Sequence, residues 1–386
     1  MSTQAESRNR GASRAAPSAG RSPAAVRVVT LPGDGIGPEV IEVAVAVLSA
    51  ACSEGGITLH VEERPVGGRA IDETGMPLPP ATLEACRGAD AVLLGAVGGP
   101  RWDHLRGAMR CEAGLLGLRR GLRVFANLRP VRVHPALADR SPVRREVVSG
   151  TDLMIVRELT GGAYFGEPRE RSGEGPTEAA RDSTVYTALE IERVARVAFR
   201  LASARHRRLI SVDKANVLIT SQLWRETVTR VAADYPDVAL EHQLVDSFAV
   251  RLMRQPAGID VVVTENLFGD ILSDEAGVLA GSLGMLPSAS LGDAGPGLYE
   301  PVHGSAPDIA GRGIANPYGA ILSVAMLLRH SLGRDDLAGA VEAAVDGCIV
   351  AGLLGADLAG SAGTRAIGEA VLRETGRRLA AAGADR

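Results

Sequence analysis

Hydrophobic and polar positions follow two patterns along most of the chain. Short apolar or alternating runs, many rich in β-branched residues, predict strands at 26–31, 58–63, 91–95, 152–156, 208–212, 238–243 and 260–264. Between them, apolar residues recur three and four positions apart, which predicts helices at 40–51, 81–88, 190–204 and from residue 266 onward. Three further helices are expected after residue 317. Alternating strands and helices favour the α/β class.

The stretch from Asp260 to Asp274 combines both patterns, because a buried strand runs through a short polar turn into a helix. Asp270 and Asp274 are four residues apart and therefore share one helix face. A divalent cation would compensate two carboxylates beside an apolar stripe, since hard cations prefer carboxylate oxygen. The alternative is two solvated acids near a helix N-terminus, where the helix dipole favours negative charge.

Composition limits the classes of partner. The chain has 386 residues, 46% of them hydrophobic, with a formal net charge of -4, which suits a globular protein of two or three domains. No apolar run approaches the ~20 residues of a membrane span. The near-neutral charge and the aromatic fraction of 3% give no support for a nucleic-acid partner.

The cysteines and the first residues bear on localisation. Four cysteines lie far apart without a C-x-x-C motif, as expected of reduced thiols in a cytoplasmic protein: Cys52, Cys86, Cys111 and Cys348. Residues 1–25 are rich in Ser, Ala, Gly and Arg and lack the apolar segment of a secretory signal. An organelle transit peptide can have this composition, but a disordered tail is the favoured interpretation.

Three glycines follow the first predicted strand. Gly33, Gly35 and Gly37 have the spacing G-x-G-x-G and are followed by Pro38, unlike the G-x-G-x-x-G of a dinucleotide-binding turn. The spacing therefore predicts a tight strand-to-helix turn and no Rossmann domain.

Ionisable residues gather near the ends of the predicted strands and on two helices. Arg119, Arg129 and Arg157 suit a small ligand with more than one carboxylate, although any single arginine more often pairs with a structural acid. Because ligands of open α/β sheets bind at the carboxyl ends of the strands, we expect a site there.

The remaining candidates suggest proton transfer beside a metal. Asp246, together with the two aspartates described above, suits Mg²⁺ or Mn²⁺. Lys214 would then be a base and Tyr164 an acid, although a surface lysine and a loop tyrosine with one hydrogen bond are the plain alternatives. These groups predict metal-assisted chemistry on a dicarboxylic hydroxy acid, with a separate cofactor as hydride acceptor.

Eight long motifs carry a family resemblance: LPGDGIGPE, GAVGGPRWD, FANLRP, VRELTGGAYFGE, SVDKANVL, NLFGDILSDEAG, GSLGMLPSASLG and EPVHGSAPDIAGRGIANP. From Val28 to about Leu372 the chain resembles the metal-dependent β-decarboxylating dehydrogenases, which include isocitrate and 3-isopropylmalate dehydrogenases. The resemblance implies a non-Rossmann α/β fold of two lobes with the site in the cleft between them. The first lobe would comprise 26–124 and 281–386, and the second would comprise 125–280.

The resemblance also implies a homodimer with shared sites and a role for each motif residue. Lys214, lent by the partner subunit, would be the base and Tyr164 the acid. The substrate would be bound by Arg119, Arg129, Arg157, Asp246, Leu115, Leu116 and Val217, and the metal by Asp246, Asp270 and Asp274. NAD would be bound by Gly99, Glu112, Glu300, His303, Gly304, Ser305, Ala306, Pro307, Asp308, Ile309 and Asn316.

Specificity rests on few of these residues. Leu115 and Leu116, with Val217 of the partner subunit, match an apolar pocket for an isopropyl group, which would leave the extra carboxylate of isocitrate unpaired. A carboxylate at Asp308 would repel the 2′-phosphate of NADP.

The resemblance thus implies NAD-dependent oxidative decarboxylation of 3-isopropylmalate to 4-methyl-2-oxopentanoate in leucine biosynthesis. The alternatives are a related enzyme for another 3-alkylmalate, tartrate or D-malate, and a non-catalytic regulatory subunit. Two positions depart from the family pattern: Cys111 stands where proline is expected, and Glu265 stands where a small residue is common.

Overall fold

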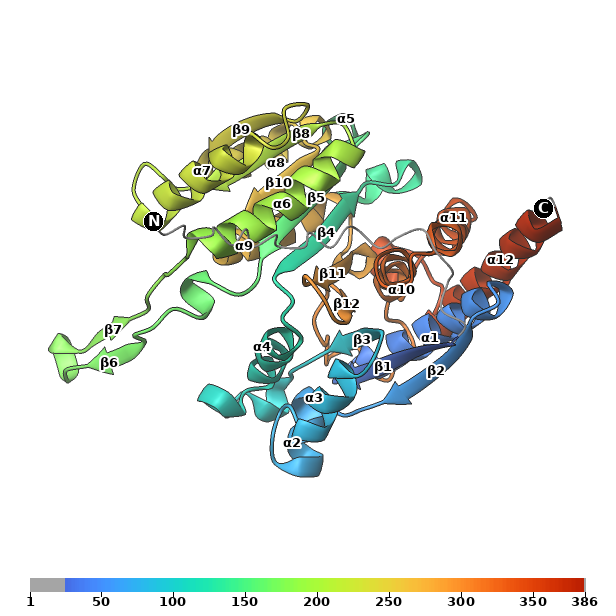
Figure 1. Cartoon of the computed structure of the whole chain (residues 1–386). Helices are drawn as coiled ribbons and strands as arrows, with labels where there is room; N and C mark the ends of the chain where they lie inside the picture. The colour runs from blue at the N-terminus through green and yellow to red at the C-terminus, as the bar shows by residue number, and fades with distance from the viewer. Residues whose placement is uncertain (1–24, 385–386) are drawn as a thin grey trace, which may run out of the picture.

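A ten-stranded sheet runs through the whole molecule (Figure 1). The computed structural model describes residues 25–384. The strand order is β2-β1-β3-β12-β11-β4-β5-β10-β8-β9. The first five strands come from both ends of the chain: β1 (Ala25–Gly33), β2 (Thr58–Glu63), β3 (Ala91–Ala96), β11 (Pro287–Leu291) and β12 (Gly297–Pro301). The other five come from its middle: β4 (Ala126–Arg132), β5 (Asp152–Glu158), β8 (Arg208–Asp213), β9 (Ala239–Leu244) and β10 (Val261–Thr264).

Antiparallel strands join the two halves of this sheet. β1 pairs in parallel with β2 and β3 in the first half, and β10 pairs in parallel with β5 and β8 in the second. Between them, β11 pairs antiparallel with both β12 and β4, and β4 pairs antiparallel with β5. Because three antiparallel pairings separate β12 from β5, the parallel strands of the two halves run in opposite directions on either side of this junction.

The helices divide in the same way. Those that accompany the first half are α1 (Gly37–Glu54), α2 (Gly67–Thr74), α3 (Pro80–Arg87), α4 (Cys111–Leu122), α10 (Tyr318–His330), α11 (Asp335–Val350) and α12 (Thr364–Ala384). Those that accompany the second half are α5 (Arg145–Val148), α6 (Ala188–Ala204), α7 (Ile219–Ala232), α8 (Val245–Arg254) and α9 (Asn266–Leu279). None of the helices in residues 25–384 is long and apolar enough to cross a membrane.

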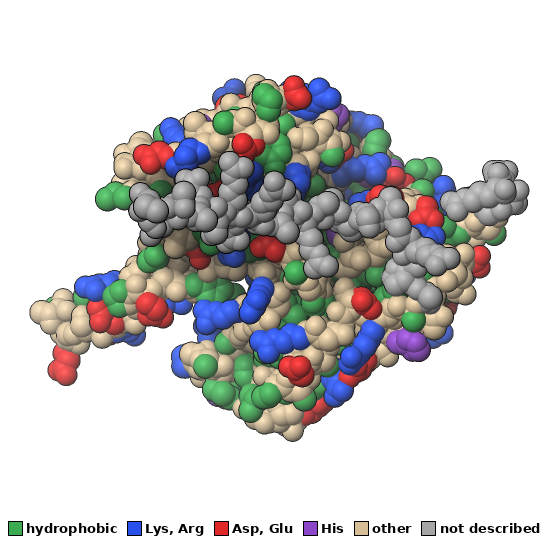
Figure 2. All heavy atoms as spheres, in the orientation of Figure 1, with side chains coloured by type: hydrophobic (Ala, Val, Ile, Leu, Met, Phe, Trp, Pro, Cys, Tyr) green, Lys and Arg blue, Asp and Glu red, His purple; other side chains and the backbone are tan. Residues whose placement is uncertain are grey.

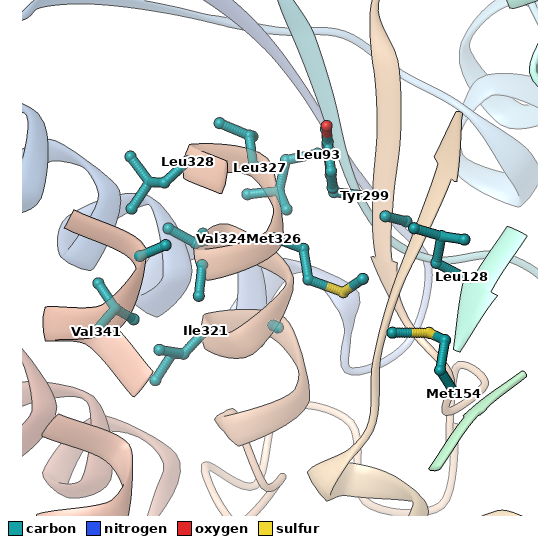
Figure 3. Packing of buried hydrophobic residues seen from close by; sticks show 14 of the residues in the cluster. Leu93, Leu128, Met154, Tyr299, Ile321, Val324, Met326, Leu327, Leu328 and Val341 are labelled. Carbon is teal, nitrogen blue, oxygen red and sulfur yellow. The ribbon is translucent and has the colours of Figure 1, made fainter. Parts of the chain in front are cut away.

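One apolar core crosses the junction. Leu128 and Met154 of the second half belong to the same buried cluster as Tyr299 and Met326 of the first half, and Figure 3 shows these side chains close together. Burial of such side chains contributes roughly 1.5–3 kcal/mol each. The two halves are therefore held together by packing as well as by strand pairing.

The glycine turn is confirmed as a tight strand-to-helix connection. Gly33 and Gly35 adopt φ of 71° and 59°, and a Cβ atom would lie 1.9 Å from the Ala96 carbonyl oxygen at the first and 2.0 Å from the Ser305 carbonyl oxygen at the second. The Ile36 N–H donates to the Ser305 carbonyl at 2.8 Å. Only glycine fits here, and the close approach ties the turn to the loop that follows β12.

The structure adds elements that the hydrophobic pattern did not predict. β11 was missed because Ser288 and Ser290 look exposed in the sequence but are almost fully buried. The short strands β6 (Glu170–Ser172) and β7 (Ala179–Arg181) form an exposed hairpin that projects from the body of the molecule with charged side chains on it (Figure 2). Asp246 lies in the first turn of α8, directly after β9. The predicted N-terminal tail falls largely on residues 1–24, outside the described residues.

Candidate active site

A cleft of about 360 Å³ lies at the junction of the two halves. It is lined by residues of α4, of β12 and the loop after it, and of β4, β5 and α9. The cleft brings together these predicted site residues: Leu115, Leu116, Arg119, Arg129, Arg157, Tyr164, Asp270, Glu112, Glu300, His303 and Gly304.

Arg157 is the most deeply buried cation of the cleft. Its Nε and Nη2 atoms both donate to Asn266 Oδ1, at 3.0 and 2.8 Å, and its Nη1 atom donates to Asp270. Burial, together with the positive charge of Arg129, lowers the pKa of Arg157 to about 10, so the guanidinium keeps its charge at neutral pH.

The other two arginines are paired with acids of the same site. Arg129 donates to Asp274 at 3.0 Å and to Asp270 at 3.4 Å. Arg119 donates to Glu300 at 2.8 Å, and its Nε atom is buried without a hydrogen-bond partner in the described part of the chain. The plain alternative, that each arginine pairs with an acid, therefore holds in this structure, but the acids are themselves predicted site residues.

Tyr164 and Asp270 form a direct contact within the cleft. The Tyr164 hydroxyl donates to Asp270 Oδ2 at 2.5 Å, and the Arg157 guanidinium carbon lies 5.4 Å from the centre of the tyrosine ring. Burial and the neighbouring Asp270 carboxylate raise the pKa of Tyr164. Burial opposes ionisation of Asp270, but Arg157 and the tyrosine hydroxyl outweigh it and hold the pKa of this carboxyl below its usual value. Tyr164 is therefore protonated and able to donate at neutral pH.

The residues that the resemblance assigns to a partner subunit, Lys214, Asp246 and Val217, lie away from the cleft in the single chain. Lys214 donates to Asp246 at 2.5 Å, and the Asp246 side chain is 63% exposed. Val217 is also exposed. Within residues 25–384, no three Asp, Glu, His or Cys side chains gather as a metal site. That these residues complete the site of a second copy stays a prediction.

Four of the predicted cofactor residues line the cleft, namely Glu112, Glu300, His303 and Gly304. Ser305 contacts the glycine turn through its carbonyl. Asn316 donates to Asp357 at 2.8 Å, and Asp308 is exposed. Gly99, Ala306, Pro307 and Ile309 do not line the cleft.

Sequence reasoning missed several polar residues that hold the arginines. Asn127 accepts from Arg129 Nε at 2.8 Å, and Ser273 accepts from Arg129 Nη1 at 2.6 Å. Asn266 accepts from two nitrogens of Arg157, and Ser288 lines the cleft from the missed strand β11. The one available signal was a polar residue inside an apolar run, which requires a hydrogen-bond partner when buried.

Comparison with known proteins identifies the family to which this fold and cleft belong. The family model of the isocitrate/isopropylmalate dehydrogenases matches residues 27–371. The chain belongs to this family. The predicted two-lobed, non-Rossmann α/β fold is confirmed, and the family's members are oxidoreductases.

Relatives and solved structures agree with that assignment. The chain is 58% identical to 3-isopropylmalate dehydrogenase of Anaeromyxobacter dehalogenans over 347 residues, which cover 90% of this chain and 98% of that protein. It is 56% identical to 3-isopropylmalate dehydrogenase of Halalkalibacterium halodurans, with 90% and 96% covered.

The crystal structure of isocitrate dehydrogenase from Methylococcus capsulatus has a TM-score of 0.80 to this chain at 35% identity, with 91% of this chain and 99% of that chain covered. The apo β-decarboxylating dehydrogenase of Thermococcus kodakarensis has a TM-score of 0.73 at 40% identity, with 91% and 96% covered.

Proposed function

We propose that this dehydrogenase catalyses the NAD-dependent oxidative decarboxylation of 3-isopropylmalate to 4-methyl-2-oxopentanoate, a step of leucine biosynthesis. The observation that carries the proposal is a single cleft with three arginines and an apolar wall, formed by Leu115 and Leu116. Three guanidinium groups suit a dicarboxylate, and the leucines suit a branched alkyl group. The names of the relatives support the same substrate.

The chemistry follows from the ionisable groups. Lys214 of the partner subunit removes the proton of the substrate hydroxyl while the hydrogen on the same carbon leaves as hydride. The bond between the adjacent carbon and its carboxylate then breaks. CO₂ leaves, and the electron pair of the broken bond forms an enolate. Tyr164 donates a proton to the enolate carbon, which yields the 2-oxo acid. The pKa of Tyr164, raised by burial and by Asp270, keeps that proton available.

The carboxylates of the cleft fit a divalent cation. Burial raises the pKa of Asp274, the nearby charge of Asp270 adds to this, and a cation bound between the two carboxylates would offset both effects. Asp270 and Asp274, with Asp246 of the partner subunit, would hold Mg²⁺ or Mn²⁺. The cation would supply positive charge beside the substrate oxygens, and NAD would supply the hydride acceptor.

An exposed apolar surface supports the shared-site dimer. Leu267, Ile271 and Val278 lie on one side of α9, Val250 lies on the neighbouring α8, and all four are exposed large hydrophobic residues. Such a surface suggests an interface between protein chains. We infer that two copies pack there and that each lends Lys214, Asp246 and Val217 to the other. We also propose that 26–124 with 281–386 form one lobe of each copy and that 125–280 form the other.

The direct test is a product assay with the purified protein alone. Incubation with 3-isopropylmalate, NAD and Mg²⁺ should produce NADH, CO₂ and 4-methyl-2-oxopentanoate in equal amounts. NADH formation without CO₂ would contradict the decarboxylation step. Turnover with D-malate or tartrate but not with 3-isopropylmalate would contradict the substrate.

A further inference from the structure

Asn266 holds the guanidinium of Arg157 from one side. Its Oδ1 atom accepts from two nitrogens of the arginine, and the side chain is almost fully buried. Two hydrogen bonds to one acceptor fix the plane of a guanidinium and leave Nη1 directed at Asp270. The position that Arg157 takes toward a ligand therefore depends on where Asn266 is held.

Asn266 is held in turn by two contacts outside its own side-chain carbonyl. It is the first residue of α9, and its backbone N–H donates to the Tyr186 hydroxyl at 2.9 Å. A first-turn N–H has no partner within its helix, so the tyrosine supplies the missing acceptor. Its Nδ2 atom donates to the Gly161 carbonyl at 3.2 Å, in the loop that carries Tyr164.

Glu265 fixes the tyrosine hydroxyl. Tyr186 donates to Glu265 Oε2 at 3.2 Å, and the same carboxylate accepts from the backbone N–H groups of Leu267 and Phe268, at 3.2 and 2.7 Å. The glutamate thus caps α9 and orients Tyr186 at the same time. This role accounts for an acid at a position where a small residue is common in the family pattern.

The Tyr186 ring also lies against the backbone of the loop that carries Tyr164. A Cβ atom at Gly161 would lie 2.5 Å from the ring, and a Cβ atom at Gly162 would lie 2.5 Å from the hydroxyl. The Gly162 N–H donates to the Val185 carbonyl at 3.0 Å, next to the tyrosine. The loop is therefore pressed onto Tyr186 two residues before Tyr164.

We propose that Tyr186, Glu265 and Asn266 form a positioning network that sets both the substrate-binding Arg157 and the loop of the proton donor Tyr164. None of the three touches the reacting atoms, so they are positioning residues. The inference rests on the proposed function, because that function assigns the substrate carboxylate to Arg157.

Tyr186→Phe is the mildest test, since it removes one oxygen atom and keeps the ring. It leaves the Asn266 N–H without its acceptor and Glu265 without its hydroxyl donor. We expect the KM for 3-isopropylmalate to rise about tenfold, the effect of one lost buried hydrogen bond, while the KM for NAD stays unchanged. Asn266→Ala, which removes both contacts of the side chain, should raise the KM further.

Two comparisons separate positioning from general loss of stability. Tyr299→Phe also removes a buried hydroxyl, bonded to Ser331 at 2.8 Å, but leaves the network intact and should not change the substrate KM. Glu265→Gln keeps an oxygen acceptor for α9 and a side chain of the same size, so its KM should stay within about threefold of the unmodified enzyme, whereas Glu265→Ala should behave like Tyr186→Phe.

A second readout does not depend on the substrate. Amide hydrogen exchange of residues 158–167 should become faster in Tyr186→Phe and remain unchanged in Tyr299→Phe, because only the first variant releases the loop. An unmodified enzyme without 3-isopropylmalate activity would refute the proposed function, and the exchange result would still decide on the network. An unchanged substrate KM in an active Tyr186→Phe enzyme, or unchanged exchange in this loop, would refute the positioning network but not the proposed function.

Discussion

His330 should make the protein lose stability in mild acid. It is the last residue of α10 and lines a second cavity, of about 540 Å³, between α10, α11 and the strands β4 and β5. Burial, followed by the positive charge of Arg329, lowers the pKa of His330 from 6.5 to about 4. The folded state thus requires the neutral imidazole over a range of pH in which the unfolded chain binds a proton.

The sign and the magnitude follow from that difference. A histidine with a lowered pKa contributes its full stability above about pH 6.5, and the contribution falls as the pH drops towards 4. The difference between 6.5 and about 4 corresponds to about 3 kcal/mol, because each factor of ten in proton affinity is about 1.4 kcal/mol.

Urea unfolding at pH 7 and pH 4.5, at one fixed protein concentration, measures this contribution. The unmodified protein should lose about 2–3 kcal/mol more free energy of unfolding between the two pH values than His330→Gln does. His60→Gln is the control, because His60 is an exposed histidine of β2 and its removal should leave the pH dependence unchanged. Equal losses in the unmodified protein and His330→Gln would refute the reasoning.

Three further predictions concern the active site. Asp270→Asn should weaken Mn²⁺ binding by about tenfold or more, because one charge on the hard cation is lost, and an unchanged metal titration would move the site elsewhere. Mixing the inactive variants Lys214→Ala and Tyr164→Phe should restore some activity, since one of the two sites in a hybrid dimer is intact. No recovery despite subunit exchange would exclude shared sites. The unmodified enzyme should prefer NAD over NADP by about 10²-fold in kcat/KM, and Asp308→Lys with Ile309→Tyr should shift the preference towards NADP. Equal use of both cofactors by the unmodified enzyme would show that Asp308 does not face the ribose.

The sequence predicted those parts of the fold that depend on local hydrophobic pattern. The buried parallel strands, such as β10, stand out because they are apolar on both faces. β11 did not, because Ser288 and Ser290 are buried in a sheet in which one of its two partner strands, β4, comes from a distant part of the chain. No local pattern records that pairing.

The residues of the candidate site also divide into those that the sequence predicted and those that it did not. Charged residues such as Arg157 were predictable because they carry chemistry and belong to long motifs. Tyr186, which holds the Asn266 N–H, lies 80 positions away from it, and its sequence context shows only a tyrosine before a helix. The side chains that position a site depend on tertiary contacts, so the charged residues that line the cleft were predicted better than the residues that hold them.

The ratio of kcat/KM for 3-isopropylmalate to that for isocitrate tests the central claim most directly. The wall formed by Leu115 and Leu116 offers the extra carboxylate of isocitrate no partner in this chain's cleft, and burial of an unpaired charge is costly. We expect 3-isopropylmalate to be preferred by about 10²-fold or more, with NAD and Mg²⁺ present. A ratio near one, or a preference for isocitrate, would contradict the account.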